Sequence, residues 1–171
     1  MQNNGISRRR HRALVHRPDR ARFLSCFQRE LVDANILLYA VDETSSSHEP
    51  ARAWLEDALN GTRRVGIPWQ SITAFLRIAT NPRALTEALS PSAAWDLVEA
   101  WLDSPAAWIP QPLSGHREIL GRLLSHLELR ANLVSDAVLA ALCLEHGLVI
   151  VSADSDFARF TEIEWHNPVR R

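Results

Sequence analysis

An apolar run near the start of the chain, LVDANILLYA at residues 31–40, contains a single carboxylate, Asp33. A strand that is buried in a parallel sheet is a nearly continuous apolar run, so an acid inside one is expected where the strand meets a cleft. A buried carboxylate is costly unless it is paired, hydrogen-bonded or bound to a metal ion. Asp33 is therefore the first candidate for chemistry. The alternative is that Asp33 only caps a helix that begins at Asn35.

Length and composition indicate one globular domain. The chain has 171 residues, of which 46% are hydrophobic and 23% are charged, and these values argue against a disordered chain or a coiled coil. No run approaches the roughly 18 apolar residues of a membrane span, and no apolar signal-peptide region follows the basic N-terminus. The sequence therefore predicts a cytoplasmic protein that does not contact a membrane.

Residues 1–29 differ in charge from the rest of the chain. They hold eight arginines and one aspartate, although the whole chain has a net charge of −1. They show no helical or strand period, and Pro18 interrupts them, so we expect a mostly disordered extension followed by a domain at residues 30–171. Two interpretations stay open. The extension could bind RNA phosphates, or it could be a lead-in produced by a start codon assigned too early, which we favour.

The remainder of the chain alternates short apolar runs with amphipathic patterns of helical period. This alternation favours an α/β layer fold with a central, mainly parallel sheet, in which ligands gather beyond the carboxyl ends of the strands. A polar hinge is expected at residues 131–136. The expected strands are 31–34, 65–69, 108–110 and 148–152, and the expected helices are 35–41, 50–59, 72–80, 91–102, 116–129 and 137–146.

Three acids lie at the ends of apolar elements: Asp33 in the first strand, Asp136 before an apolar helix and Asp154 after the last strong strand. Carboxylates that converge without a cysteine or histidine cluster suit Mg²⁺ or Mn²⁺, which prefer oxygen ligands. Such an ion can orient a phosphodiester and activate water. The spacing alone does not separate a nuclease from a phosphatase or from a set of helix caps.

Four segments carry a resemblance to a known family: LVDANILLYAVDE, HEPARAWLE, PWQSITAFLRIATNPR and SDAVLAALCLEHGLVIVSADSDFARF. Over residues 31–167 the chain resembles the PIN-domain ribonucleases, and closely the VapC-type toxins of type II toxin–antitoxin modules. The resemblance implies a PIN-like α/β/α sandwich that cuts RNA with Mg²⁺ (Mn²⁺ possible). It also implies a homodimer that is neutralised by a cognate VapB-type antitoxin.

The resemblance assigns roles to individual residues. It implies catalysis and metal binding by the three acids, Asp33, Asp136 and Asp154. It also implies three supporting residues: Asn35, Ser152 and Asp156.

One position departs from the family pattern. Ala74 stands where the family usually has a glutamate, and a missing carboxylate should weaken metal binding. Glu43 and Glu99 are candidate substitutes. The leading hypothesis is a metal-dependent endoribonuclease toxin. The alternatives are a catalytically impaired PIN module that binds RNA or antitoxin, and a small-molecule phosphohydrolase.

Overall fold

The structure is a computed structural model that describes residues 29–126 and 132–170. Except for Arg29, the predicted N-terminal extension lies outside the described residues. So do residues 127–129 of the predicted helix 116–129. The described residues contain no helix that is long and apolar enough to cross a membrane.

A five-stranded sheet forms the centre of the domain, with the strand order β3-β2-β1-β4-β5. All four strand pairs are parallel. The central strand β1 lies between β2 and β4 because its apolar residues can be buried on both faces. The strands are β1 (Arg29–Val32), β2 (Val65–Gly66), β3 (Ala107–Trp108), β4 (Leu148–Val151) and β5 (Trp165–His166).

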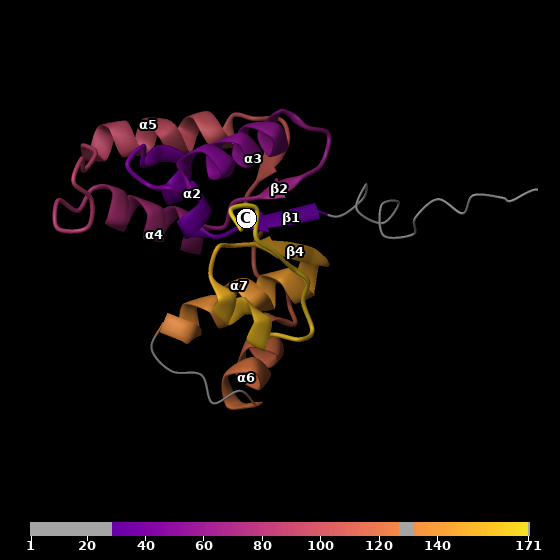
Figure 1. Ribbon diagram of the computed structural model, residues 1–171. Helices are drawn as coiled ribbons and strands as arrows, with labels where there is room; N and C mark the ends of the chain where they lie inside the picture. Colours follow the sequence, from indigo (N-terminus) through magenta and orange to yellow (C-terminus); the bar gives the residue numbers. More distant parts are fainter. Residues whose placement is uncertain (1–28, 127–131, 171) are drawn as a thin grey trace, which may run out of the picture.

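Helices cover both faces of the sheet, which confirms the predicted α/β/α sandwich (Figure 1). On one face lie α2 (Ala34–Val41), α3 (His48–Asn60), α4 (Trp69–Ala79) and α5 (Pro91–Leu102). On the other face lie α6 (His116–His126) and α7 (Asn132–His146), and the short 3-10 helix η1 (Ser155–Arg159) follows β4.

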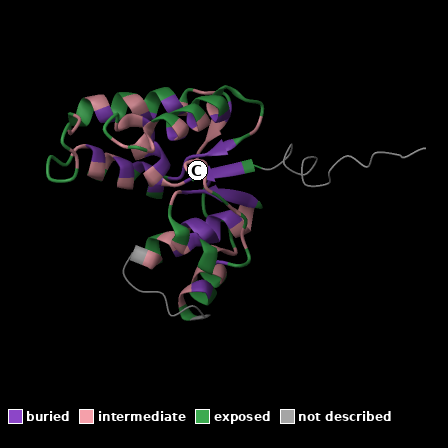
Figure 2. Cartoon of the chain, in the orientation of Figure 1, coloured by how far each residue is buried: buried purple, intermediate pink, exposed green. Residues whose placement is uncertain are grey.

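Alternating strand residues divide the core between the two layers. Successive side chains of a strand point to opposite faces, so Val32 packs with α2 to α5, whereas Leu31 packs with α6 and α7. Both side chains are fully buried. Figure 2 shows buried residues along the central strands and on the helix faces that meet them. The sheet therefore holds the carboxyl ends of β1 and β4 in fixed positions.

Several predicted elements are wrong in part, among them the strand expected at 108–110, which the structure has at Ala107–Trp108. The strand expected at 65–69 ends at Gly66, and Trp69 is the first residue of α4. The proline at position 68 has no N–H to donate to a sheet, and it lies immediately before the helix. The polar hinge expected at 131–136 is also wrong over its described part, since α7 begins at Asn132. Ser135 and Asp136 are therefore helical residues, and both line a cavity between α4 and α7.

The edge strand β5 was absent from the sequence-based prediction. It is two residues long and shows no strand pattern, but backbone bonds hold it to β4: Ile150 N–H donates to the Glu164 carbonyl (2.9 Å), and Ser152 N–H donates to the His166 carbonyl (3.0 Å). The Trp165 indole N–H also donates to the Ser152 carbonyl (2.8 Å). These bonds fix the segment that follows β4.

Candidate active site

Asp33 follows the last residue of β1 and is the N-cap of α2. Its backbone N–H continues the sheet by donating to the Val151 carbonyl (3.0 Å). Its Oδ1 accepts from the Ala34 N–H (2.6 Å), and α2 begins at Ala34 rather than at Asn35. Asp33 therefore caps the helix and also stands at the carboxyl end of the central strand, so the two interpretations of this residue do not exclude each other.

Asn35 and Ser152 brace the Asp33 carboxylate. The Asn35 amide and the Ser152 hydroxyl each donate to Asp33 Oδ2, both at 2.7 Å. The Asn35 amide also donates to Ser152 Oγ (2.9 Å), which in turn accepts from the Asp154 N–H (3.0 Å). These four residues join the end of β1 to the end of β4 in one polar network.

The carboxylate of Asp33 keeps room for one further contact. An ionised carboxylate has about four acceptor sites, and three are used by Ala34, Asn35 and Ser152. Burial raises the pKa of Asp33 above its ordinary value, and the charge of Asp154 raises it further, while the bonds from Ser152 and Ala34 act in the opposite direction. A positive group near the unused site would favour the ionised form.

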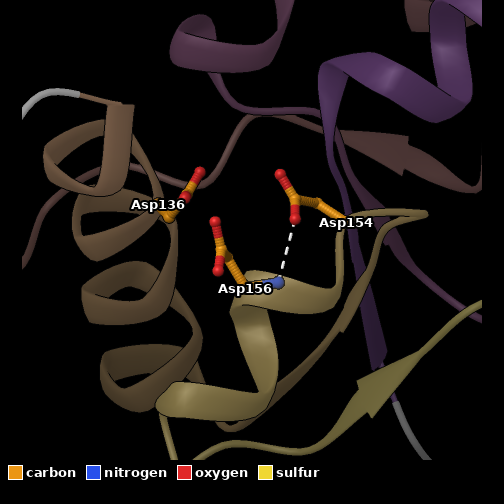
Figure 3. A group of neighbouring side chains, drawn as sticks. All are labelled: Asp136, Asp154 and Asp156. Atoms are coloured by element: carbon orange, nitrogen blue, oxygen red, sulfur yellow. Dashed lines mark hydrogen bonds between the residues drawn. The ribbon is translucent and has the colours of Figure 1, made fainter.

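A second set of acids lies beside Asp33. Asp136 on α7, Asp154 before η1 and Asp156 within η1 point toward one another, and one carboxylate oxygen from each lies within 4.8 Å of the others (Figure 3). Asp154 accepts from the Asp156 N–H (2.9 Å) and so caps η1. Arg159 donates to Asp156 (3.0 Å). Asp156, expected only as a supporting residue, lies within this group.

Mutual repulsion and burial change the acidity of Asp136. Burial is the largest cause that raises its pKa to about 6, followed by the charges of Asp33, Asp154 and Asp156. Asp33, Asp136 and Asp154, the three acids predicted to converge, therefore interact through their charges near the carboxyl ends of β1 and β4. Carboxyl groups that resist ionising together are stabilised by a cation between them.

A cavity of about 450 Å³ opens between α4 and α7 and is lined by both Asp33 and Asp136. Ala74 also lines it, as expected for the position where the family pattern has a glutamate. Neither candidate substitute borders this cavity: Glu43 lines a different one beside Phe75, and Glu99 is exposed on α5. Among the described residues, neither glutamate therefore replaces the missing carboxylate.

The donor set suits a hard divalent cation. In the group formed by Asp136, Asp154 and Asp156, every candidate ligand atom is a carboxylate oxygen, and no cysteine or histidine of the described residues belongs to the group. Oxygen-only sites favour Mg²⁺, Mn²⁺ or Ca²⁺ over zinc or copper. The side chains present at the site thus fit the divalent ion that the sequence resemblance implies.

Two cavity residues were not singled out from the sequence. Ser71 is buried and donates to the Val32 carbonyl (2.7 Å), which fixes α4 against the end of β1. Arg77 lies on the same helix and contributes a cation to the cavity. Both stand three residues from Ala74, on the helix face that carries it, and this spacing could have identified them.

Ser152→Ala should destabilise the metal-free protein. The hydroxyl is fully buried, and its loss leaves Asn35, Asp154 and Asp33 each short of one hydrogen bond. We expect the free energy of unfolding to fall by roughly 1–3 kcal/mol, measured by urea denaturation. The exposed Ser114→Ala is the control and should change it by less than about 0.5 kcal/mol. Equal effects of the two variants would mean that the network adds no stability.

Asp136→Asn should alter how stability depends on pH. Because its pKa is about 6 in the folded protein against an ordinary 3.8, folding favours the protonated form, so the wild type loses stability as the pH rises between these values. In the presence of a chelator, the variant should melt at a higher temperature than the wild type at about pH 7.5 and show little advantage at about pH 4.5. Asp96→Asn, exposed on α5, is the control. A melting difference independent of pH would contradict this account.

Comparison with known proteins agrees with this geometry. A family model described as PIN domain matches residues 31–163. Ribonuclease VapC37 of Mycobacterium tuberculosis is 46% identical over 139 residues, which cover 81% of this chain and 96% of that protein. Ribonuclease VapC33 of the same species is 38% identical over 138 residues, which cover 81% of this chain and 96% of that protein.

Solved structures share the fold at low identity. VapBC-1 from nontypeable Haemophilus influenzae has a TM-score of 0.60 at 14% identity and covers 82% of this chain and 98% of its own. DNA-bound VapBC from Salmonella typhimurium has a TM-score of 0.60 at 16% identity, and the match covers 83% of this chain and 99% of the other. The sheet, the acidic cavity and the full-length similarity to curated relatives agree: the chain belongs to the PIN-domain family and, within it, to the VapC ribonucleases.

Proposed function

We propose that the protein is the toxin of a type II toxin–antitoxin system, a metal-dependent endoribonuclease that a cognate VapB-type antitoxin neutralises. Its curated relatives are named VapC ribonucleases, and its structural neighbours are VapBC complexes. One observation carries the proposal: three carboxylates lie within 4.8 Å of one another, beside a cavity lined by Asp33. We propose that it acts in the cytoplasm, where RNA is available as a substrate.

Mg²⁺ is the proposed ion, with Mn²⁺ as a possible replacement. When bound, such an ion neutralises charge on a phosphodiester and makes water a better nucleophile at neutral pH. Asp136, Asp154 and Asp156 would hold it, together with the unused acceptor site of Asp33. We assign catalysis to Asp33, Asp136 and Asp154 and a ligand role to Asp156.

The protein's own residues prepare the site. Asn35 and Ser152 fix the orientation of Asp33 before substrate arrives, so little reorganisation accompanies the reaction. The hydrogen bond that the Asp156 N–H donates to Asp154 likewise sets the orientation of the Asp154 carboxylate toward Asp136. Ser71 holds α4 against β1, which keeps the cavity open to a strand entering between α4 and α7.

A catalytically impaired module that binds RNA or antitoxin is the second candidate. It is favoured by Ala74, which lines the cavity at the position of the usual glutamate, while Glu43 and Glu99 lie elsewhere. The position of Asp156 supports the active enzyme instead, because it brings a third carboxylate to the group around Asp136. A homodimer is the proposed assembly in either case.

The test is cleavage of RNA by the purified protein with Mg²⁺, with cleavage sites mapped by sequencing RNA 5′ ends after brief expression in cells. Asp154→Asn should lower the cleavage rate by more than roughly 100-fold, the upper end of what outer partners of a metal site contribute. Asp96→Asn should cleave like the wild type. Growth arrest by the wild type should be relieved by Asp154→Asn and by co-expression of the cognate antitoxin. Cleavage that persists in Asp154→Asn would refute the assigned site.

Ala74→Glu should restore a carboxylate to the cavity and distinguish the two candidates. Without metal, the added charge should lower the melting temperature because it meets acids that already repel one another. With Mg²⁺ the charge becomes a ligand, so the metal-induced rise in melting temperature should increase, and cleavage should need less metal. Ala53→Glu, at an exposed position of α3, is the control. It should change neither the metal-induced rise in melting temperature nor the metal concentration that cleavage needs. If the metal dependence of Ala74→Glu matches that of the wild type, residue 74 does not contribute to the metal site.

A further inference from the structure

Arg77 is the only cationic side chain among the described residues that line the acidic cavity. Its guanidinium is exposed and forms no ion pair within residues 29–126 and 132–170. Arg52, Arg122 and Arg159 do form ion pairs, whereas Arg83 and Arg117, which lie away from the cavity, have none within the described part of the chain. An unpaired cation beside acids points to a ligand that carries negative charge into the cavity.

A tryptophan shares the exposed helix face with Arg77. Trp69, Thr73 and Arg77 are spaced four residues apart on α4, which places them in one row. All three are exposed, and Trp69 keeps 43% of its surface accessible. The Thr73 hydroxyl is already used, since it donates to the Trp69 carbonyl (2.8 Å). The row therefore offers one aromatic surface and one cation.

Single-stranded RNA matches both groups. Its phosphates accept forked hydrogen bonds from a guanidinium, and its unpaired bases stack on aromatic side chains with little regard to sequence. A double helix would offer the phosphates but not the base faces. A peptide would match both groups only if it carried an acidic and an apolar or aromatic side chain at the right spacing, whereas every nucleotide of a single strand carries both a phosphate and a base.

We propose that the exposed face of α4 from Trp69 to Arg77 binds single-stranded RNA at the entrance to the cavity. Arg77 holds a phosphate beside the acids, and Trp69 stacks on a neighbouring base. The inference rests on the proposed ribonuclease function and adds the substrate-binding residues to it. Arg77 also lies in the last turn of α4, where a positive charge interacts favourably with the helix dipole and stabilises the helix. A purely structural role of that kind would affect melting but not RNA affinity.

RNA binding can be measured without cleavage in an Asp154→Asn background with Mg²⁺, by fluorescence anisotropy of a fluorescein-labelled, unstructured RNA oligonucleotide. Arg77→Gln should weaken binding and reduce the slope of log affinity against log salt by about 0.7, the value for one single-strand phosphate. Trp69→Leu should weaken binding by roughly 5- to 150-fold with the slope unchanged. Arg83→Gln and Trp95→Leu are controls, because both residues are exposed outside the cavity.

Kinetics on the otherwise wild-type enzyme provide the second measurement. Arg77→Gln and Trp69→Leu should raise KM while kcat stays near that of the wild type, as expected for contacts equally strong in the ground and transition states. Arg77→Lys should recover part of the affinity because it restores the charge but not the fork. The melting temperatures should change little.

Three results would overturn the inference. If the wild type cleaves RNA and both variants bind and cleave like the controls, the function stands and the α4 site fails. If the wild type neither binds nor cleaves RNA with Mg²⁺ or Mn²⁺, the proposed function itself fails, and the α4 site with it. If both variants bind RNA normally but no longer copurify with the antitoxin used for growth rescue, this face binds protein instead.

Discussion

The Asp33 carboxylate, held by the Ala34 N–H, the Asn35 amide and the Ser152 hydroxyl, is the interaction on which the site depends. It begins α2, and it connects the ends of two adjacent parallel strands through side chains rather than through the sheet ladder. If its partners were lost, a nearly buried carboxyl group would lack hydrogen bonds and would favour its neutral form. Structure and chemistry at this position are therefore inseparable.

The same arrangement sets a limit on stability. Asp33, Asp136, Asp154 and Asp156 lie close enough for their charges to raise the pKa of Asp136, so the fold maintains a repulsion that folding alone does not require. Apolar burial offsets it: the central strands and the helices on both faces form two hydrophobic clusters around the sheet. A functional site commonly violates the local rules that the rest of the chain obeys.

Elements with strong local patterns could be predicted from the sequence. The apolar runs of β1 and β4 and the helical periods of α3 and α5 identify buried faces, and the position of Asp33 follows from the end of its strand. Elements that form only through contacts with distant parts of the chain could not be predicted in this way. β5 is held by hydrogen bonds to β4, and the approach of Asp156 to Asp136 depends on how η1 turns after the sheet. The start of α7 at Asn132 was obscured because Ser135 and Asp136, two adjacent polar residues near its beginning, resemble a loop in the sequence.

The parallel sheet also has a consequence for the timing of synthesis. Parallel strands cannot be joined by tight hairpins, and Ser152, which donates to Asp33, lies 119 residues further along the chain. A ribosome must therefore complete almost the entire domain before β4 can dock beside β1 and the acids can meet. A nascent chain that stops before residue 152 carries Asp33 and Asp136 but lacks Asp154, Asp156 and the hydroxyl that orients Asp33. With the site as proposed, a nascent chain would acquire ribonuclease activity only after its last strands have left the ribosome.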